Sequence, residues 1–314
     1  MLYLTTRNKA DSYTAHRVLR SETAPDGGQF LPMQTPVLTD VQLAAIEQMT
    51  FGEATAFTMN LFFGTQLTGW DVDFAIGRQV MDLPYIGHQV HVAESWHNPA
   101  GSHAYMAQRL YALVVGEKIP AQKPNLWFHT CVDIAVILGA YGRLCRGDVY
   151  TFDVAVETGD LQLLLALRYA QKMGVPIQKI ILGSFDGDGL WEFFSYGDYP
   201  TARKLLPSGL ESLLWLEFSH DMVKNYLQIA DKRGIFKLSP VQQELFAKDI
   251  FVAVVGDGRA ADVAASAQRT SQYAMEHTTA RAFGALQDLR AKLGEKRNTM
   301  LFSRKITYNQ NNSK

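Results

Sequence analysis

Residues 149–184 constrain the fold more than any other part of the sequence, because they hold two apolar, β-branched runs on either side of one amphipathic segment. The first run, residues 149–156, has the sequence VYTFDVAV, and the second, residues 179–184, has the sequence KIILGS. Residues 161–173 between them carry apolar side chains at helical spacing. This order predicts a βαβ unit with parallel strands and a right-handed crossover. Asp153 is the only charged residue of the first run, so we expect that strand in the centre of a sheet.

The alternation of strands and helices continues on both sides of this unit. Further strands are predicted at residues 2–6, 89–95, 251–256 and 299–302, and further helices at residues 38–49, 53–63, 71–81, 102–117, 126–144, 186–196, 259–275 and 279–293. The pattern predicts an α/β fold, with a mainly parallel central sheet flanked by helices and a small mixed N-terminal segment. We expect an N-terminal segment at residues 1–83, an α/β large domain at residues 84–306 and a disordered tail at residues 307–314.

Charge and cysteine usage narrow the class of protein. The 314 residues have a formal net charge of −1, with both signs spread along the chain, so we expect no nucleic-acid partner. No apolar run reaches the roughly 18 residues of a spanning helix, and the N-terminus lacks the apolar region of a signal peptide. A cytoplasmic protein is therefore expected.

Cys131 and Cys145 lie on one predicted helix, about 21 Å apart along its axis, so we expect buried free thiols and no disulfide between them.

Histidines and one glutamate suggest a metal site at residues 88–97. His88, His91, Glu94 and His97 follow one another at intervals of three residues. On a strand, His88 and Glu94 would face one side while His91 and His97 would face the other. We therefore expect no metal at this site.

Two glycine-containing turns resemble phosphate-binding loops. Gly256, Asp257 and Gly258 precede a helix, but no strand with an acidic end follows at the distance of a dinucleotide site, so we expect Asp257 to cap that helix. Thr158-Gly159-Asp160 joins a strand to a helix, where backbone N–H groups could hold a phosphate. Asp160 there adds negative charge, so a turn in which it caps the helix is favoured. No nucleotide-binding or nucleophile motif names a reaction.

Several stretches resemble the threonine synthase family, pyridoxal-phosphate enzymes of fold type II. Residues 24–32, APDGGQFLP, are similar to the N-terminal loop of that family, and residues 94–105, ESWHNPAGSHAY, align with the segment that carries its Schiff-base lysine. Residues 150–199 are similar to the family's strand, phosphate loop, helix and next strand. Glu94 and His97 match the family, whereas Ala104 stands at the position of the lysine. The resemblance implies the large-domain fold of threonine synthase.

At the positions that bind the cofactor in the family, this sequence has different residues. The loop that binds the cofactor phosphate in the family is here Glu157, Thr158, Gly159 and Asp160, with a carboxylate at each end. A small subdomain, on the order of 100 residues, is expected to be missing between residues 117 and 126. Schiff-base chemistry needs an amine, which Ala104 lacks. The resemblance therefore implies that pyridoxal phosphate has been lost and that no cofactor replaces it.

Two functions follow from this comparison. The first is a threonine synthase-like pseudoenzyme without catalytic residues, which acts as a partner or ligand-binding module. Its candidate ligand pocket consists of Glu94, His97, Asn98 and His103. The alternative is a threonine synthase-like lyase with a remodelled site, which acts on phosphohomoserine or a related amino-acid phosphate.

The missing subdomain also predicts a partner. Its loss should uncover apolar side chains, namely Trp96, Tyr105, Leu110, Trp127 and Phe128. Monomeric proteins rarely leave contiguous apolar patches larger than a few hundred Å². We therefore expect a homodimer through residues 102–144, with an intact threonine synthase as the alternative partner. Collapse of the two helices in this region onto each other is the remaining explanation.

Overall fold

The computed structural model describes residues 1–77, 81–98, 100–146, 151–200 and 206–304. An antiparallel sheet in the order β2-β1-β3 forms within the N-terminal segment. Its strands are β1 (Leu2–Thr5), β2 (Tyr13–Thr14) and β3 (Phe30–Pro32). The strand expected near the N-terminus is thus present, and it belongs to a sheet separate from the central one.

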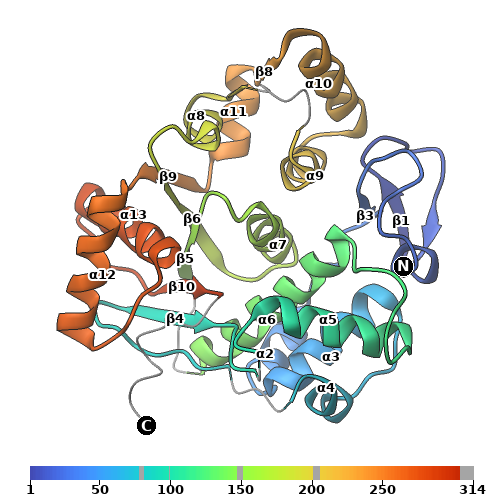
Figure 1. Cartoon of the computed structure of the whole chain (residues 1–314), viewed down its shortest axis with the longest axis horizontal. Coiled ribbons are helices and arrows are strands. Elements are labelled where there is room, and N and C mark those ends of the chain that lie inside the picture. Colours follow the sequence, from blue (N-terminus) through green and yellow to red (C-terminus); the bar gives the residue numbers. More distant parts are fainter. Residues whose placement is uncertain (78–80, 99, 147–150, 201–205, 305–314) are drawn as a thin grey trace.

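The central sheet has five parallel strands in the order β4-β10-β5-β6-β9. They are β4 (Val90–Glu94), β5 (Phe152–Glu157), β6 (Ile177–Ser184), β9 (Ile250–Val254) and β10 (Thr299–Ser303). The expected α/β fold is confirmed, and β5 lies in the middle of the sheet, as its apolar sequence predicted (Figure 1). Residues 149 and 150 of the predicted strand lie outside the described residues. β10 is late in the sequence, yet it pairs with both β4 and β5.

Helices cover both faces of this sheet (Figure 1). α6 (Leu126–Cys145) and α7 (Leu161–Lys172) pack together on one face, and α12 (Asp257–Ser271) and α13 (His277–Leu293) cover the other. Successive side chains of a strand point to opposite faces. Val154 of β5 accordingly belongs to the core with α6 and α7, and Ala155 belongs to the core with α12 and α13.

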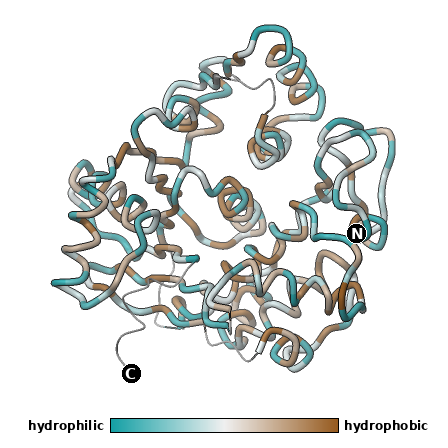
Figure 2. Tube along the Cα trace, viewed as in Figure 1, coloured by the Kyte–Doolittle hydropathy of each residue, from teal (hydrophilic) through white to brown (hydrophobic). Residues whose placement is uncertain are grey.

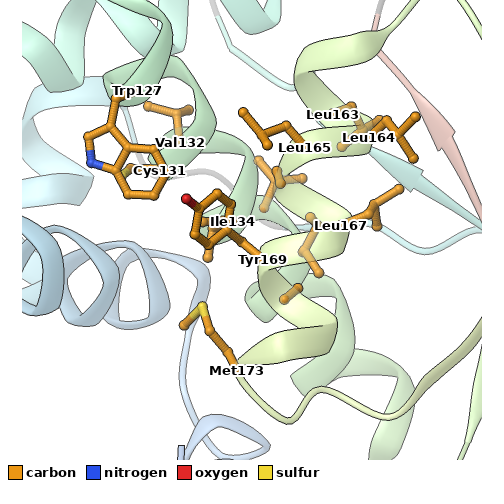
Figure 3. Close-up of a cluster of buried hydrophobic side chains, with 14 of the residues drawn as sticks. Trp127, Cys131, Val132, Ile134, Leu163, Leu164, Leu165, Leu167, Tyr169 and Met173 are labelled. Atoms are coloured by element: carbon orange, nitrogen blue, oxygen red, sulfur yellow. The ribbon is translucent and has the colours of Figure 1, made fainter. Parts of the chain in front are cut away.

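Aromatic and aliphatic side chains fill the space between α6 and α7 (Figure 3). The ring of Trp127 on α6 meets the ring of Tyr169 on α7 edge to face, with centroids 4.9 Å apart. Cys131, next to them, is buried, and Cys145 at the end of α6 is buried as well; neither forms a disulfide. The expectation of two buried thiols is confirmed.

The remaining elements belong to the N-terminal segment or lie between the strands. They are α1 (Ala15–Leu19), α2 (Asp40–Ile46), α3 (Phe51–Phe63), α4 (Gly69–Ile76), α5 (His103–Val115), α8 (Gly189–Tyr196), β7 (Asp198–Pro200), α9 (Ser208–Glu217), α10 (His220–Arg233), β8 (Ile235–Lys237) and α11 (Pro240–Ala247). β7 pairs with β8 in a two-stranded antiparallel sheet. The insertion between β6 and β9, which contains α8 to α11, lies at the top of Figure 1.

Capping residues set several helix boundaries, and two predictions about helix ends were wrong. Thr39 caps α2, because its side chain accepts from the backbone N–H of Gln42. α4 ends at Ile76 and not near residue 81, because Gly77 adopts a φ of 74° and terminates the helix. α12 begins at Asp257 with Gly256 at the N-cap, so Asp257 lies in the first turn and is not the cap.

Hydrophobic residues concentrate along the central strands and the helices packed on them, whereas hydrophilic residues dominate the outer loops (Figure 2). Among the described residues, α6 alone is long and apolar enough to cross a membrane, so the expectation that no apolar stretch reaches this length was wrong. However, 83% of that window is buried inside the protein. Its apolar sequence is accounted for by its position in the core.

The apolar side chains expected to be uncovered near residues 102–144 are mostly buried within the chain itself. Trp127 is 1% exposed, and Leu110 and Phe128 are fully buried. Trp96 is 8% exposed, and only Tyr105 of the five is half-buried. α5 packs on α6 where Tyr111 meets Phe128, and other elements of the same chain cover Trp127 with Tyr3, Phe62 and Tyr169. The expectation of an uncovered patch was wrong. An uncovered apolar surface therefore no longer supports a homodimer through residues 102–144, and the homodimer stays a prediction.

Candidate functional site

The carboxyl ends of three neighbouring strands define the candidate site. β4 ends at Glu94, β10 at Ser303 and β5 at Glu157, and Ser303 is the register partner of Glu94. Parallel α/β sheets bind their ligands at this edge, because loops and helix N-termini meet there. The loop before α5, the turn before α7 and Arg304 after β10 all reach this edge.

Asp133 is the centre of a charged cluster beside the edge. This residue of α6 is 1% exposed, and its carboxylate receives three neighbours from other elements. Arg304 Nη2 donates to Asp133 Oδ2 over 2.9 Å, and Gln162 Nε2 donates to the same oxygen over 2.6 Å. His103 Nε2 lies 3.0 Å from Asp133 Oδ1. The cluster thus joins the start of α5, the middle of α6, the start of α7 and the end of β10.

The charged groups of this cluster stabilise one another's ionised forms. Burial opposes ionisation of Asp133, but the Arg304 guanidinium and the His103 ring hold the pKa of this carboxyl below its usual range. Burial also opposes the charge of Arg304, and the carboxylates of Asp133 and Asp160 raise the pKa of its guanidinium. Because unpaired buried charges are costly, each group in the cluster depends on its partners.

The turn between β5 and α7 is closed by the chain's own side chains. Asp160 caps α7, as predicted, since its Oδ1 accepts from the backbone N–H of Leu163 over 3.1 Å. Arg304 Nη2 donates to Asp160 Oδ1 over 3.1 Å, and Arg304 Nε contacts Asp160 Oδ2. The guanidinium therefore meets both oxygens of one carboxylate. A carboxylate and a guanidinium of the chain occupy the N-terminus of α7, where an anion could otherwise bind.

Glu157 and Thr158, in the first half of the same turn, also form hydrogen bonds with other side chains of the chain. Glu157 Oε1 accepts from Arg281 Nη1 over 2.9 Å, and Thr158 Oγ1 donates to Asp188 Oδ2 over 2.5 Å. Burial raises the pKa of Glu157 above its usual value, and Arg281 opposes this shift only partly. Gly159 completes the turn.

A cavity of about 270 Å³ adjoins this turn. Among the described residues that line it, three carry carboxylates, namely Glu157, Asp160 and Glu276, and one carries a guanidinium, Arg304. Thr278 and Thr279 contribute hydroxyl groups, and Phe302 and Leu163 supply apolar surface. No lysine is among these lining residues. The cavity is therefore lined by more negative than positive side chains.

Ala104 lies in the first turn of α5 and is exposed. Its methyl group offers no nucleophile. His103, its neighbour, points to Asp133 instead.

The four residues of the predicted ligand pocket separate into three environments. Glu94 and His97 converge, with His97 Nε2 2.6 Å from Glu94 Oε2. The expectation that they face opposite sides was wrong, because β4 ends at Glu94 and the following loop turns His97 back. Asn98 organises the loop, since its Oδ1 accepts from the N–H groups of Ala100 and Ser102. His103 joins the Asp133 cluster.

Glu94 has a second partner that the sequence did not indicate. Tyr273 Oη donates to Glu94 Oε1 over 2.7 Å, and both side chains are buried. The pKa of His97 is raised, mainly by its hydrogen bond to Glu94. Glu94 also borders a second cavity of about 500 Å³, together with Asp82, His91 and Arg143. His97, Asn98 and His103 are not among the described residues that line it.

Sequence reasoning missed Asp133 and Arg304, the two central members of the charged cluster. One signal for Asp133 was present, because it is the only carboxylate in the apolar helix LWFHTCVDIAVILGAYGRLC. Carboxylates are almost never fully buried unless paired, so this residue predicts a buried partner. Nothing in the sequence around Arg304 shows that it is that partner.

Comparisons with known proteins agree with this architecture. Residues 2–78 match the family model described as the threonine synthase N terminus. Solved structures of threonine synthases share the fold. The yeast enzyme matches with a TM-score of 0.82 at 16% identity, over 97% of this chain and 87% of that chain. The pyridoxal-phosphate-bound enzyme from Brucella melitensis matches with a TM-score of 0.83 at 15% identity, over 98% and 89%. The Escherichia coli enzyme matches with a TM-score of 0.71 at 13% identity, over 98% and 88%.

No curated protein sequence matches the chain significantly. The resemblance to threonine synthase inferred from the sequence is confirmed for the N-terminal segment by the family model, and for the fold by the structures. The loss of a subdomain and of the cofactor stay predictions.

Proposed function

We propose that this threonine synthase-like chain is a pseudoenzyme, which keeps the fold and uses its sheet edge to bind a ligand or a partner without pyridoxal-phosphate catalysis. A cytoplasmic location is part of the proposal. The observation that carries it is the position of Arg304, whose guanidinium lies against Asp133 and Asp160 at the N-terminus of α7. In this position a positively charged side chain of the protein is already neutralised by the protein's own carboxylates.

The residues present do not fit pyridoxal phosphate. The cofactor needs an amine for its imine and an anion site for its phosphate. Ala104 supplies no amine, and the described residues lining the cavity beside the turn include no lysine. Asp160 already accepts from the N-terminus of α7, and Glu157 and Glu276 add negative charge to the same cavity. A phosphate dianion would be repelled there.

The test is addition of pyridoxal phosphate to the purified protein. We expect no internal-aldimine absorbance band, and after borohydride reduction we expect no single modified lysine by peptide mass spectrometry. An intact threonine synthase treated in the same way serves as the positive control. A band that saturates, with one stoichiometrically labelled lysine, would contradict the proposal.

The alternative, a lyase acting on phosphohomoserine or a related amino-acid phosphate, is less well supported by the same geometry. Its substrate also carries a phosphate, which three lining carboxylates disfavour. Release of inorganic phosphate from phosphohomoserine measures this alternative directly. We expect no release above a blank without protein.

A further inference from the structure

The guanidinium of Arg304 lies between two carboxylates at the sheet edge. Arg304 Nη2 donates to Asp160 Oδ1 over 3.1 Å, and Arg304 Nε lies against Asp160 Oδ2 without donating a hydrogen bond to it. A guanidinium spreads its charge and its N–H groups over a plane, so it can contact two carboxylates at once more readily than a compact ammonium group. Arg304 Nη2 also donates to Asp133 Oδ2 over 2.9 Å. One guanidinium is thus held by two carboxylates from two helices.

Each of the two carboxylates also has a hydrogen-bond donor other than Arg304. Asp133 is held by Gln162 Nε2 at 2.6 Å and faces His103 Nε2 at 3.0 Å. Asp160 is held by the backbone N–H of Leu163, as the cap of α7. α6 and α7 pack tightly on each other through a buried core. We therefore expect the two acceptors to keep their places when the arginine side chain is removed.

The cavity beside this contact gives room for a ligand that brings its own guanidinium. Its volume is about 270 Å³, and its lining includes Arg304 and Asp160 themselves. Glu157 and Glu276 extend the negative lining away from Arg304, and Phe302 offers an apolar surface. A small organic cation with a short apolar chain fits this combination of charge and size.

We propose that Asp133 and Asp160 form a guanidinium-binding site, in which Arg304 is the resident ligand, and that the adjoining cavity takes a small molecule carrying a guanidinium group when Arg304 vacates it. The inference deepens the proposed function, because it names the ligand class of the same sheet edge. Arg304 then acts as an internal competitor of that ligand.

The experiment is chemical rescue of Arg304→Ala with methylguanidinium chloride, compared with equal concentrations of sodium chloride and methylammonium chloride. We expect Arg304→Ala to unfold at a lower temperature than the wild type. Methylguanidinium at about ten times its Kd should then raise the Tm of the variant by about 2 °C, but leave the wild type within about 0.5 °C of its value in sodium chloride. Methylammonium should give less than half of the rescue.

Two matched controls separate this site from general salt effects. Arg304→Ala combined with Asp160→Asn removes one of the two carboxylates and should not respond. Arg259→Ala breaks another two-oxygen contact, to Asp288, on the protein surface, and should not respond either. An Arg304→Ala variant that responds no more than Arg259→Ala overturns the proposal.

A folding failure is also informative. If Arg304→Ala is unfolded in buffer, folding in the presence of methylguanidinium supports the site. Failure of both Arg304→Ala and Arg304→Gln to fold or to gain stability in methylguanidinium counts against it. The pyridoxal-phosphate titration of the wild type is independent of these outcomes, so failure of this inference is distinguishable from failure of the proposed function.

Discussion

The hydroxyl of Tyr273 donates to Oε1 of Glu94 over 2.7 Å, although 179 positions separate the two residues in the sequence. Both side chains are buried, and Glu94 is the last residue of β4. The contact therefore fixes the segment between α12 and α13 to the carboxyl edge of the sheet.

Replacement of this hydroxyl tests how much the contact stabilises the protein. We expect Tyr273→Phe to lower the free energy of unfolding by about 1–3 kcal/mol, because a buried carboxylate oxygen loses its donor. Urea denaturation measures the change. Tyr196→Phe is the control, since Tyr196 is exposed, and it should change the stability by less than about 0.5 kcal/mol. Equal effects of the two substitutions would show that the buried hydrogen bond adds nothing.

The pair of His97 and Glu94 predicts a pH-dependent contribution to stability. The pKa of His97 is raised in the folded protein by Glu94. The protonated ring therefore stabilises the fold below the ordinary pKa of about 6.5, and this stabilisation is lost as the pH rises through the raised value. We expect His97→Gln to destabilise the protein more at about pH 6 than at about pH 9. Urea denaturation at both pH values tests this.

His129 provides a control of opposite sign. Burial lowers its pKa, so protonation of its ring costs stability as the pH falls. Relative to the wild type, His129→Gln should therefore gain stability at low pH, where His97→Gln loses it. If both variants shift in the same direction with pH, the assignment of the two histidines is wrong.

Asp133 should be the most sensitive charged position. Asp133→Asn leaves the Arg304 guanidinium without one of its two carboxylates and removes the charge that faces His103. Breaking a buried ion pair costs about 3–5 kcal/mol, so we expect a loss of about 3 kcal/mol in the free energy of unfolding. Asp262→Asn, on the exposed side of α12, is the matched control and should change it by less than about 0.5 kcal/mol. A small effect of Asp133→Asn would mean that the cluster is well solvated.

Restoring the lysine alone should not restore catalysis. We expect Ala104→Lys to give no threonine from phosphohomoserine, because the turn at residues 157–160 keeps its carboxylates and the Arg304 contact. Product analysis with added pyridoxal phosphate measures this, and Ala104→Arg controls for a new positive charge at this exposed position. Turnover by Ala104→Lys would show that the amine was the only missing group.

The two tryptophans Trp127 and Trp70 should respond very differently to truncation. Trp127 is 1% exposed and packs against Phe62 and Tyr169, so Trp127→Ala should cost about 3–5 kcal/mol. Trp70 on α4 is 71% exposed and stacks on the exposed Phe74, so Trp70→Ala should cost less than about 1 kcal/mol. Urea denaturation, with light scattering to record the oligomeric state, compares them. A Trp127→Ala variant of nearly wild-type stability would show that the region at residues 102–144 is not packed within one chain.

The sequence by itself determined the elements and the local chemistry of the turns. The βαβ unit around α7, the cap at Asp160 and the buried thiols of Cys131 and Cys145 were all predicted correctly. Each depends on side-chain spacing or hydrogen bonding within a few residues, where the backbone geometry is known once the element is known. The alanine at position 104 is likewise a fact of the sequence alone.

Tertiary structure alone decided which distant groups meet. β10 lies between β4 and β5, and this strand order brings Arg304 to Asp133, 171 positions away. The same path of the chain buries Trp127, which the sequence left as a candidate for exposure, and the end of β4 turns His97 back to Glu94. Hydrophobic periodicity indicates which face of an element is buried, but the partner of that face depends on the packing of the whole chain. The charged cluster at the sheet edge follows from that packing and not from any local motif.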